Sequence, residues 1–240
     1  MAVFAREATE NYHQRQSSTA QRHERRYFRS LSEANGEIMT RLLIATTNPG
    51  KRREYAAIFA GLPLELFTLP DLGIADDVEE TGVTFAENAR IKAEYYLQRG
   101  GMVVLADDSG LEVAALGGEP GVYSARYAGP DATDAERNAF LLRKLEGVPF
   151  HARLARFVCV IALARHDGAV EFVEGALPGV IDLAPRGHHG FGYDPLFYIL
   201  DEDATLAELP LERKNQISHR AVAARAARAV LERWMHEGAL

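Results

Sequence analysis

Two adjacent carboxylates, Asp107 and Asp108, directly follow the apolar run MVVLA (residues 102–106). Neighbouring side chains of a strand point to opposite faces, so two acids at the end of a predicted strand need not share one role. Ligands of open α/β sheets gather at this edge. Paired acids can hold Mg²⁺ through oxygen ligands while one carboxylate activates water. The alternative is that Asp107 or Asp108 caps the turn predicted at Ser109-Gly110.

A second acidic pair, Glu79 and Glu80, precedes the segment TGVTFAENA. Its carboxylates can complete a metal shell together with Asp108. A solvated loop is the alternative reading, and the sequence alone favours it.

The segment TTNPGK (residues 46–51) lies between a predicted strand at 41–45 and a predicted helix. The N-terminus of a helix presents free N–H groups and the positive end of the helix dipole, which suit a phosphate. Thr46, Thr47 and Asn48 add side-chain donors, and Lys51 adds a point charge. The segment is not a Walker A loop, because the leading Gly is missing and an arginine follows the lysine. A capped helix with a surface lysine is the alternative.

The segments GHHGFGYDPLFY and KNQISHR carry the third group of polar and aromatic residues. Glycines on both sides of Phe191 place an aromatic ring on a flexible backbone, which suits stacking on a nucleobase. His219 and Arg220 open a predicted helix, where cations oppose the dipole by ~0.3–1 kcal/mol, so a local role is expected. Their donors suit carbonyl oxygens on a base edge. His188 and His189 are interpreted as a polar loop.

A mixed α/β sheet is the scaffold that the sequence predicts for these segments. Asn48 is a good N-cap, Thr84 and Glu87 have capping-box spacing, and Gly100-Gly101 ends the helix that follows. Residues 155–164 and 169–177 read as two strands joined by a hairpin at Asp167-Gly168. Residues 218–234 read as a C-terminal helix. Together the three groups predict a phosphate-binding site, a site for a metal ion and water, and a pocket that recognises a base. This combination indicates that the ligand is a nucleoside triphosphate.

Composition narrows the class of protein further. The 240 residues carry a net charge of −7, which disfavours a general nucleic-acid binder. The single cysteine, Cys159, excludes an intramolecular disulfide and fits a buried position in a cytoplasmic protein. No stretch approaches a membrane span. Residues 1–38 are polar and aperiodic, so we expect a disordered extension, or translation begun upstream of a natural start at Met39, followed by one domain over 39–240.

The order of five motifs resembles the inosine triphosphate pyrophosphatase family. These motifs are TTNPGK, EETGVTFAENARIKA, ADDSGLEVAALGGEPGVYSARYAG, FGYDPLF and KNQISHR. The resemblance runs from about Met39 to the C-terminus. It implies hydrolysis of ITP, dITP and XTP to the nucleoside monophosphate and pyrophosphate with Mg²⁺, in a homodimer. It also implies an elongated mixed β-sheet flanked by helices, with two lobes and a central cleft.

The resemblance also implies roles for individual residues. Asp108 is expected as the general base and as a metal ligand together with Glu79, whereas the role of Asp107 is left open. The residues expected to bind the substrate are Thr46, Thr47, Asn48, Pro49, Gly50, Lys51, Lys92, Ser109, Phe191, Gly192, Tyr193, Asp194, Lys214, His219 and Arg220. Arg220 suits the C6 carbonyl of hypoxanthine and xanthine, and adenine would place donor against donor. How guanine is rejected does not follow from the sequence.

Three other functions are weighed against this one. A septum-formation-type nucleotide pyrophosphatase is related but prefers pyrimidine or modified nucleotides, and the FGYDP and SHR segments argue against it. A nucleotide sensor without turnover is disfavoured by the complete set of acids. An RNA-binding role for the N-terminal extension is weak because its acids nearly balance its bases.

Overall fold

The computed structural model describes residues 39–240. The chain divides into two units, Met1–Thr40 and Arg41–Leu240, and the second contains the predicted site. The extension predicted over residues 1–38 lies outside the described residues. Within residues 39–240, no helix has both the length and the apolar character needed to cross a membrane.

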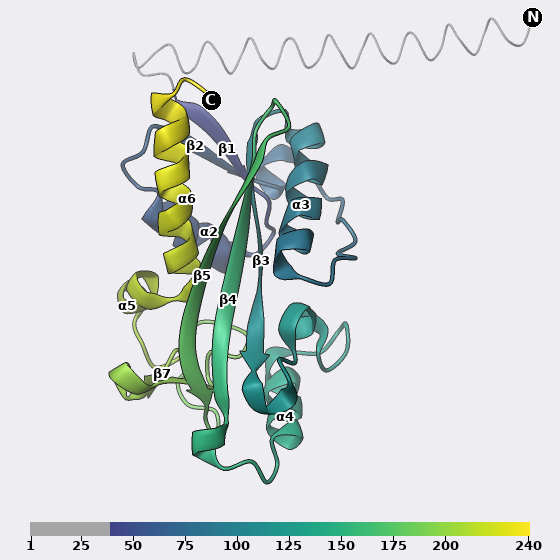
Figure 1. Cartoon of the computed structure of the whole chain (residues 1–240), viewed down its shortest axis with the longest axis vertical. Coiled ribbons are helices and arrows are strands. Elements are labelled where there is room, and N and C mark those ends of the chain that lie inside the picture. Colours follow the sequence, from purple (N-terminus) through teal and green to yellow (C-terminus); the bar gives the residue numbers. More distant parts are fainter. Residues whose placement is uncertain (1–38) are drawn as a thin grey trace, which may run out of the picture. The chain divides into compact units, whose positions relative to one another are not determined.

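One mixed seven-stranded sheet forms the scaffold, as predicted (Figure 1). The strands follow the order β2-β1-β3-β4-β5-β6-β7 across the sheet, with β1 and β3 parallel and the pairs from β3 to β7 antiparallel. The bounds are β1 Thr40–Ile44, β2 Leu64–Thr68, β3 Val103–Val113, β4 Leu154–Ala164, β5 Val170–Ile181, β6 Phe197–Ile199 and β7 Ala204–Thr205. The hairpin predicted at Asp167-Gly168 connects β4 and β5.

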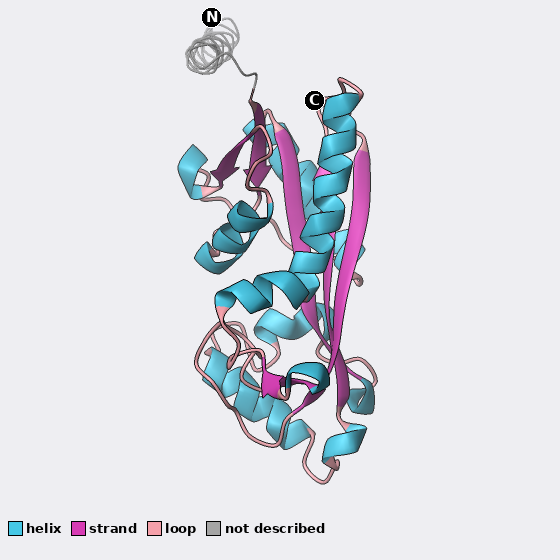
Figure 2. Cartoon of the chain, turned by 90° about the vertical axis from the view of Figure 1, so that its left-hand side faces the viewer, coloured by secondary structure: helices cyan, strands magenta, loops and turns pink. Residues whose placement is uncertain are grey.

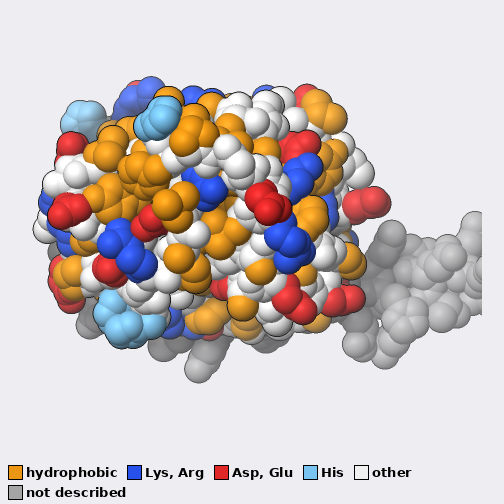
Figure 3. Space-filling view, turned by 90° about the horizontal axis from the view of Figure 1, so that it is seen from below, with side chains coloured by type: hydrophobic (Ala, Val, Ile, Leu, Met, Phe, Trp, Pro, Cys, Tyr) orange, Lys and Arg blue, Asp and Glu red, His pale blue; other side chains and the backbone are white. Residues whose placement is uncertain are grey.

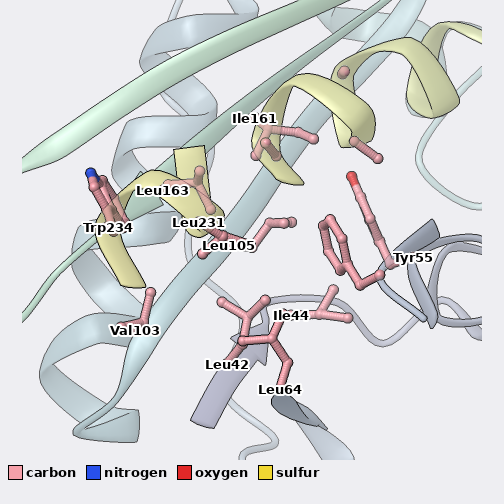
Figure 4. Packing of buried hydrophobic residues seen from close by; sticks show 14 of the residues in the cluster. Leu42, Ile44, Tyr55, Leu64, Val103, Leu105, Ile161, Leu163, Leu231 and Trp234 are labelled. Atoms are coloured by element: carbon pink, nitrogen blue, oxygen red, sulfur yellow. The ribbon is translucent and has the colours of Figure 1, made fainter. Parts of the chain in front are cut away.

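Helices cover both faces of the sheet. They are α2 Pro49–Ile58, α3 Phe85–Gly100, α4 Asp134–Lys144, α5 Leu211–Ile217 and α6 His219–His236. Helix α6 lies along β4 and β5 and packs on α2, whereas α3 packs on β3 and β4 (Figures 1 and 2). Successive side chains of a strand point to opposite faces of the sheet. Leu42 and Ile44 of β1 therefore belong to the core under α2 and α6 (Figure 4), and Leu43 belongs to the core under α3.

The predicted helix caps are present. The side chain of Asn48 accepts hydrogen bonds from the backbone of Gly50 and Lys51 at the start of α2. Thr84 and Glu87 form the reciprocal capping box of α3, which ends at Gly101 in the left-handed conformation. Short-range sequence signals therefore set where the two helices that flank the site begin.

The strand that carries the two acids is longer than predicted. Asp107 and Asp108 were expected at its end and Ser109-Gly110 in a turn, but β3 continues to Val113. The reason is the long antiparallel pairing with β4, which runs from Val104 opposite Ala164 to Val113 opposite Ala155. It is the parallel neighbour β1 that ends at Ile44, opposite Leu105. The acids thus lie just beyond the carboxyl end of β1.

A third apolar cluster fills the part of the molecule around α4, β6 and the far ends of β3 and β4. It includes Leu141 of α4, Leu145 just after that helix, Tyr193 near Phe191 and Phe197 of β6. The third apolar cluster therefore packs against both α4 and the residues that follow Phe191.

The surface seen from below exposes hydrophobic side chains among charged ones (Figure 3).

Candidate active site

A cavity of about 400 Å³ collects most of the predicted site residues. Its walls come from the start of α2, from α3, β3, α4, the segment around Phe191 and the start of α6. The predicted residues that line it are Thr46, Asn48, Lys51, Lys92, Asp108, Ser109, Phe191, Gly192, Tyr193, Asp194, Lys214, His219 and Arg220. Thr47 lines an adjoining cavity that shares Thr46, Lys51 and Lys92 with the first. Pro49 and Gly50 form the first turn of α2.

The two acids of β3 face opposite sides of the sheet, as strand geometry predicts. Asp107 faces α2 and α6, where Lys51 Nζ lies 2.8 Å and Arg220 Nε lies 3.5 Å from its Oδ2. Asp108 faces α3, where Asn88 Nδ2 donates a hydrogen bond of 3.1 Å to its Oδ2. One strand therefore supplies two carboxylates to two different environments.

Asp107 belongs to a buried network of alternating charges. Arg220 donates to Glu54 Oε2 at 2.6 Å and to Ser109 Oγ at 3.1 Å. Lys214 Nζ lies 3.4 Å from Glu54 Oε1. Burial raises the pKa of Asp107, but the positive charges of Lys51, Arg220 and Lys92 outweigh it and hold that pKa well below its usual range. Asp107 is thus an ionised structural partner of the cations.

Asp108 has the opposite electrostatic character. Burial raises its pKa; Lys92 opposes this shift, Glu80 adds to it, and the net result is a raised pKa. Lys92 Nζ lies 3.6 Å from Asp108 Oδ1 and 2.9 Å from Glu80 Oε1. A cavity-lining carboxylate with a raised pKa is suited to accept a proton, which is the task of a general base.

Glu80, and not Glu79, reaches the cavity. The sequence reading paired Glu79 with Asp108, but Glu79 is exposed, whereas Glu80 lines the cavity and bonds to Lys92. The two neighbouring residues lie in an irregular stretch before Gly82, whose N–H donates to Asn88 Oδ1 at 2.8 Å. Asn88 therefore ties both this stretch and Asp108 to helix α3.

The TTNPGK segment was predicted either to bind a phosphate or simply to cap a helix, and the structure shows the cap. Asn48 Oδ1 accepts from Gly50 N at 2.7 Å and from Lys51 N at 3.3 Å, so these backbone groups already have a partner in the helix cap. Lys51 is not a surface lysine, because its side chain is 18% exposed and pairs with Asp107. This segment therefore caps α2 and also contributes Thr46, Asn48 and Lys51 to the lining of the cavity.

The Phe191 ring lies beside the cations predicted to read a base. Lys214 Nζ is 4.8 Å and Arg220 Cζ is 5.7 Å from the ring centroid. Lys214 also pairs with Asp194 at 2.7 Å, and Asp194 Oδ2 accepts from the backbone N–H of Phe191 at 3.0 Å. An aromatic face, two cations and an anchoring carboxylate thus meet at one end of the cavity.

His219 opens α6 as a neutral ring. Burial lowers the pKa of its imidazole well below 6.5, and the charges of Arg220 and Lys214 lower it further. The ring stacks on Phe157 with centroids 4.7 Å apart, and its Nδ1 is buried without a partner among the described residues. The neutral imidazole therefore does not oppose the positive end of the helix dipole at the start of α6. Its Nδ1 has no hydrogen-bond partner among the described residues and can bond to a ligand.

This buried histidine makes stability depend on pH. The unfolded chain gains a proton as the pH falls through about 6.5, whereas folded His219 stays neutral to a lower pH. Since the unfolded state binds the extra proton, the free energy of unfolding falls below pH 6.5 by about 1.4 kcal/mol per pH unit from this group. Urea unfolding between pH 7 and pH 5.5 should show a shallower decline in His219→Gln. Exposed His166→Gln is the control, and equal slopes in all three proteins would contradict the prediction.

Sequence reasoning missed several residues that support the site. Glu54 is 4% exposed and Asn88 is fully buried, which is unusual for both residue types. Helical spacing was the available signal, because Glu54 follows Lys51 by three residues and Asn88 precedes Lys92 by four. Asp134, Arg137 and Phe157 also line the cavity, and they come from segments that carried no recognised motif.

Comparison with known proteins agrees with this geometry. The model of the Ham1 family matches residues 42–230. A dITP/XTP pyrophosphatase of Geobacter sulfurreducens is 54% identical over 182 residues, which cover 76% of this chain and 92% of the relative. Another of Thermus thermophilus is 53% identical over 186 residues, covering 78% and 89%. A solved HAM1 protein of Coxiella burnetii has a TM-score of 0.76 and 42% identity, covering 81% of this chain and 100% of that one. The resemblance seen in the motifs is confirmed, and this chain belongs to the Ham1 family.

Proposed function

We propose that this protein hydrolyses non-standard purine nucleoside triphosphates, namely ITP, dITP and XTP, to the monophosphate and pyrophosphate. The observation that carries the proposal is the cavity itself. It joins a buried carboxylate of raised pKa, Asp108, to the lysines Lys51 and Lys92 and to the aromatic ring of Phe191. The relatives of Geobacter sulfurreducens and Thermus thermophilus bear the name of this activity.

The residues present fit a Mg²⁺ ion bound together with the substrate. Asp108 and Glu80 both line the cavity and both contact Lys92. Mg²⁺ is typically held by one or two carboxylates, with water and substrate phosphates as the other ligands. Among residues 39–240 no cluster of three acidic, histidine or cysteine side chains is placed to hold a metal unaided. When bound, the ion neutralises charge that develops on the leaving pyrophosphate.

The protein's own groups perform the remaining steps. Asp108 orients a water molecule and takes its proton during attack on the α-phosphorus. The hydrogen bond from Asn88 and the backbone N–H of Ser109, which donates to Asp108 Oδ1 at 3.0 Å, hold this carboxylate in place. Lys51 and Lys92 lie where they can stabilise the negative charge of the phosphates.

Base selection follows from the donors at the other end of the cavity. The guanidinium of Arg220 has five N–H donors. Its contacts with Glu54, Asp107 and Ser109 leave donors for a carbonyl oxygen. Hypoxanthine and xanthine offer such an oxygen at C6, and adenine offers an amino group. A buried site built to bond one rejects the other by ~10⁴-fold or more when its own groups are left unpaired.

The first test is turnover of ITP and XTP with Mg²⁺, with pyrophosphate and orthophosphate detected separately and with ATP, GTP, UTP and dTTP as comparisons. We expect pyrophosphate from ITP and XTP, complete loss of turnover with a chelator, and recovery when Mg²⁺ is added back. Orthophosphate as the first product would contradict the proposed reaction. Faster turnover of UTP or dTTP would favour the septum-formation-type alternative, and tight ITP binding without product would favour a sensor.

The homodimer and the cytoplasmic location implied by the resemblance belong to the same proposal. Large hydrophobic side chains such as Leu183 and Leu200 are exposed, at 59% and 63%, which is compatible with a partner surface. Sedimentation of the purified protein at micromolar concentration tests the dimer directly.

A further inference from the structure

The backbone around Phe191 does not fix the position of its ring. Gly190 and Gly192 both have positive φ, at +83° and +63°, in the region that glycine adopts most readily. Phe191 is partly exposed, so packing alone does not define its orientation. A ring that stacks on a ligand must be held before the ligand arrives if binding is to avoid an ordering cost. The contacts that hold this segment therefore matter for binding.

Helix α4 holds both polar backbone atoms of Gly192. The N–H of Gly192 donates to Asp134 Oδ2 at 2.7 Å, and its carbonyl oxygen accepts from Asn138 Nδ2 at 3.0 Å. Asp134 and Asn138 lie four residues apart, on one face of the helix. Asn138 is only 6% exposed. The two side chains thus fix the residue next to the ring over sequence separations of more than fifty residues.

The helix that supplies these side chains is itself firmly anchored. Thr133 and Glu136 form a capping box at its start. Arg137, between the two holding residues, donates to the backbone carbonyls of Ala125 and Ala132. Leu141, on the same face of α4 and one turn beyond Asn138, packs into the third apolar cluster. Because α4 is held in place by these contacts, its side chains can fix the position of the backbone at Gly192.

We propose that Asp134 and Asn138 are positioning residues that set the Phe191 ring for stacking on the purine of the substrate. The inference rests on the proposed function, because it takes the Phe191 end of the cavity as the base site. Neither side chain is assigned a part in the chemistry at the phosphates. Loss of either contact should therefore weaken binding of the nucleoside part and leave the phosphate part unaffected.

Asn138→Asp is the first variant, because it keeps the shape but replaces the donor with a carboxylate that faces the Gly192 carbonyl. We expect KM for ITP to rise about tenfold, while kcat stays within about twofold. The Ki of inorganic tripolyphosphate, which has no base, should not change. Asp134→Ala should raise KM in the same way, and Asp134→Asn, which keeps an acceptor, should restore it.

A matched control and a double-mutant cycle separate positioning from general damage. Arg143→Ala is an exposed change on the same helix that removes no contact to Gly192, so its KM should match the wild type. In the Phe191→Ala background, Asn138→Asp should add no further rise in KM, because the ring to be positioned is gone. If Asn138→Asp fails to fold by circular dichroism, the Asp134→Ala and Asp134→Asn pair gives the same comparison.

Two results would overturn the inference. One is an equal rise in KM with and without the Phe191 ring. The other is a rise in the Ki of tripolyphosphate that matches the rise in KM for ITP, since either would mean a general structural role. Wild-type protein that does not turn over ITP would instead contradict the proposed function. The variants would then be compared by their Kd for ITP, which tests the positioning independently.

Discussion

Asp108→Asn should abolish nearly all turnover while the protein stays folded. Removal of a general base costs typically 10²–10⁴-fold, and we expect kcat for ITP to fall by about 10³-fold. KM should change little, because the asparagine oxygen still accepts the hydrogen bond that Asn88 donates to this position. The measurement is steady-state pyrophosphate release with saturating Mg²⁺. Asp131→Asn removes one exposed carboxylate and serves as the control.

A fall in kcat of less than tenfold would contradict the assignment of Asp108 as the base. A large rise in KM with little change in kcat would instead mean that this carboxylate serves mainly to bind the metal-substrate complex. The two roles predicted for Asp108 are thus separable in one set of kinetic curves.

Arg220→Ala should have the largest effect on stability. Its guanidinium is 2% exposed and compensates two buried carboxylates, Glu54 and Asp107. Removal of one partner of a buried ion pair leaves an uncompensated charge, so we expect the free energy of unfolding to fall by about 3–5 kcal/mol. Urea unfolding measures this loss. Arg225→Ala, an exposed change on the same helix, should stay within about 0.5 kcal/mol of the wild type.

Partial recovery in the double variant Arg220→Ala, Glu54→Gln would confirm the cause, because it removes one of the stranded charges together with the arginine. Equal losses in the single and double variants would contradict it. The expected instability also decides how base selection should be tested. Arg220→Lys keeps a positive charge but lacks the planar fork, so the ratio of ITP to ATP turnover is better measured in that variant than in alanine.

Local patterns predicted the scaffold well. The caps at Asn48 and Thr84, the hairpin at Asp167-Gly168 and the C-terminal helix depend on interactions within a few residues. The extent of β3 was missed because its continuation through Asp107 and Asp108 depends on pairing with β4, some fifty residues away. Charged residues in a buried strand run against the usual hydrophobic pattern, and only tertiary partners make them tolerable.

The site was predictable where a motif carried it and not elsewhere. Phe191, Lys214 and Arg220, which stood out in the sequence as unusual residue types, line one cavity. The choice between Glu79 and Glu80 depends on how an irregular loop is held against α3 by Asn88 and Lys92, and the sequence carries no signal for those contacts. Asp134 acts on Gly192 across 58 residues, and no periodicity can reveal a contact of that kind.

The opposite orientation of the two acids of β3 has a consequence for how this enzyme can diversify. On the α3 side, the carboxylates Asp108 and Glu80 line the cavity and share one cation, Lys92, so we expect substitutions there to alter rate more than folding. On the α6 side, Arg220 and Lys214, which we propose to read the base, are also the counter-ions of buried carboxylates. Variants with a new base preference should therefore need compensating changes at Glu54 or Asp107 before they are stable enough to be selected.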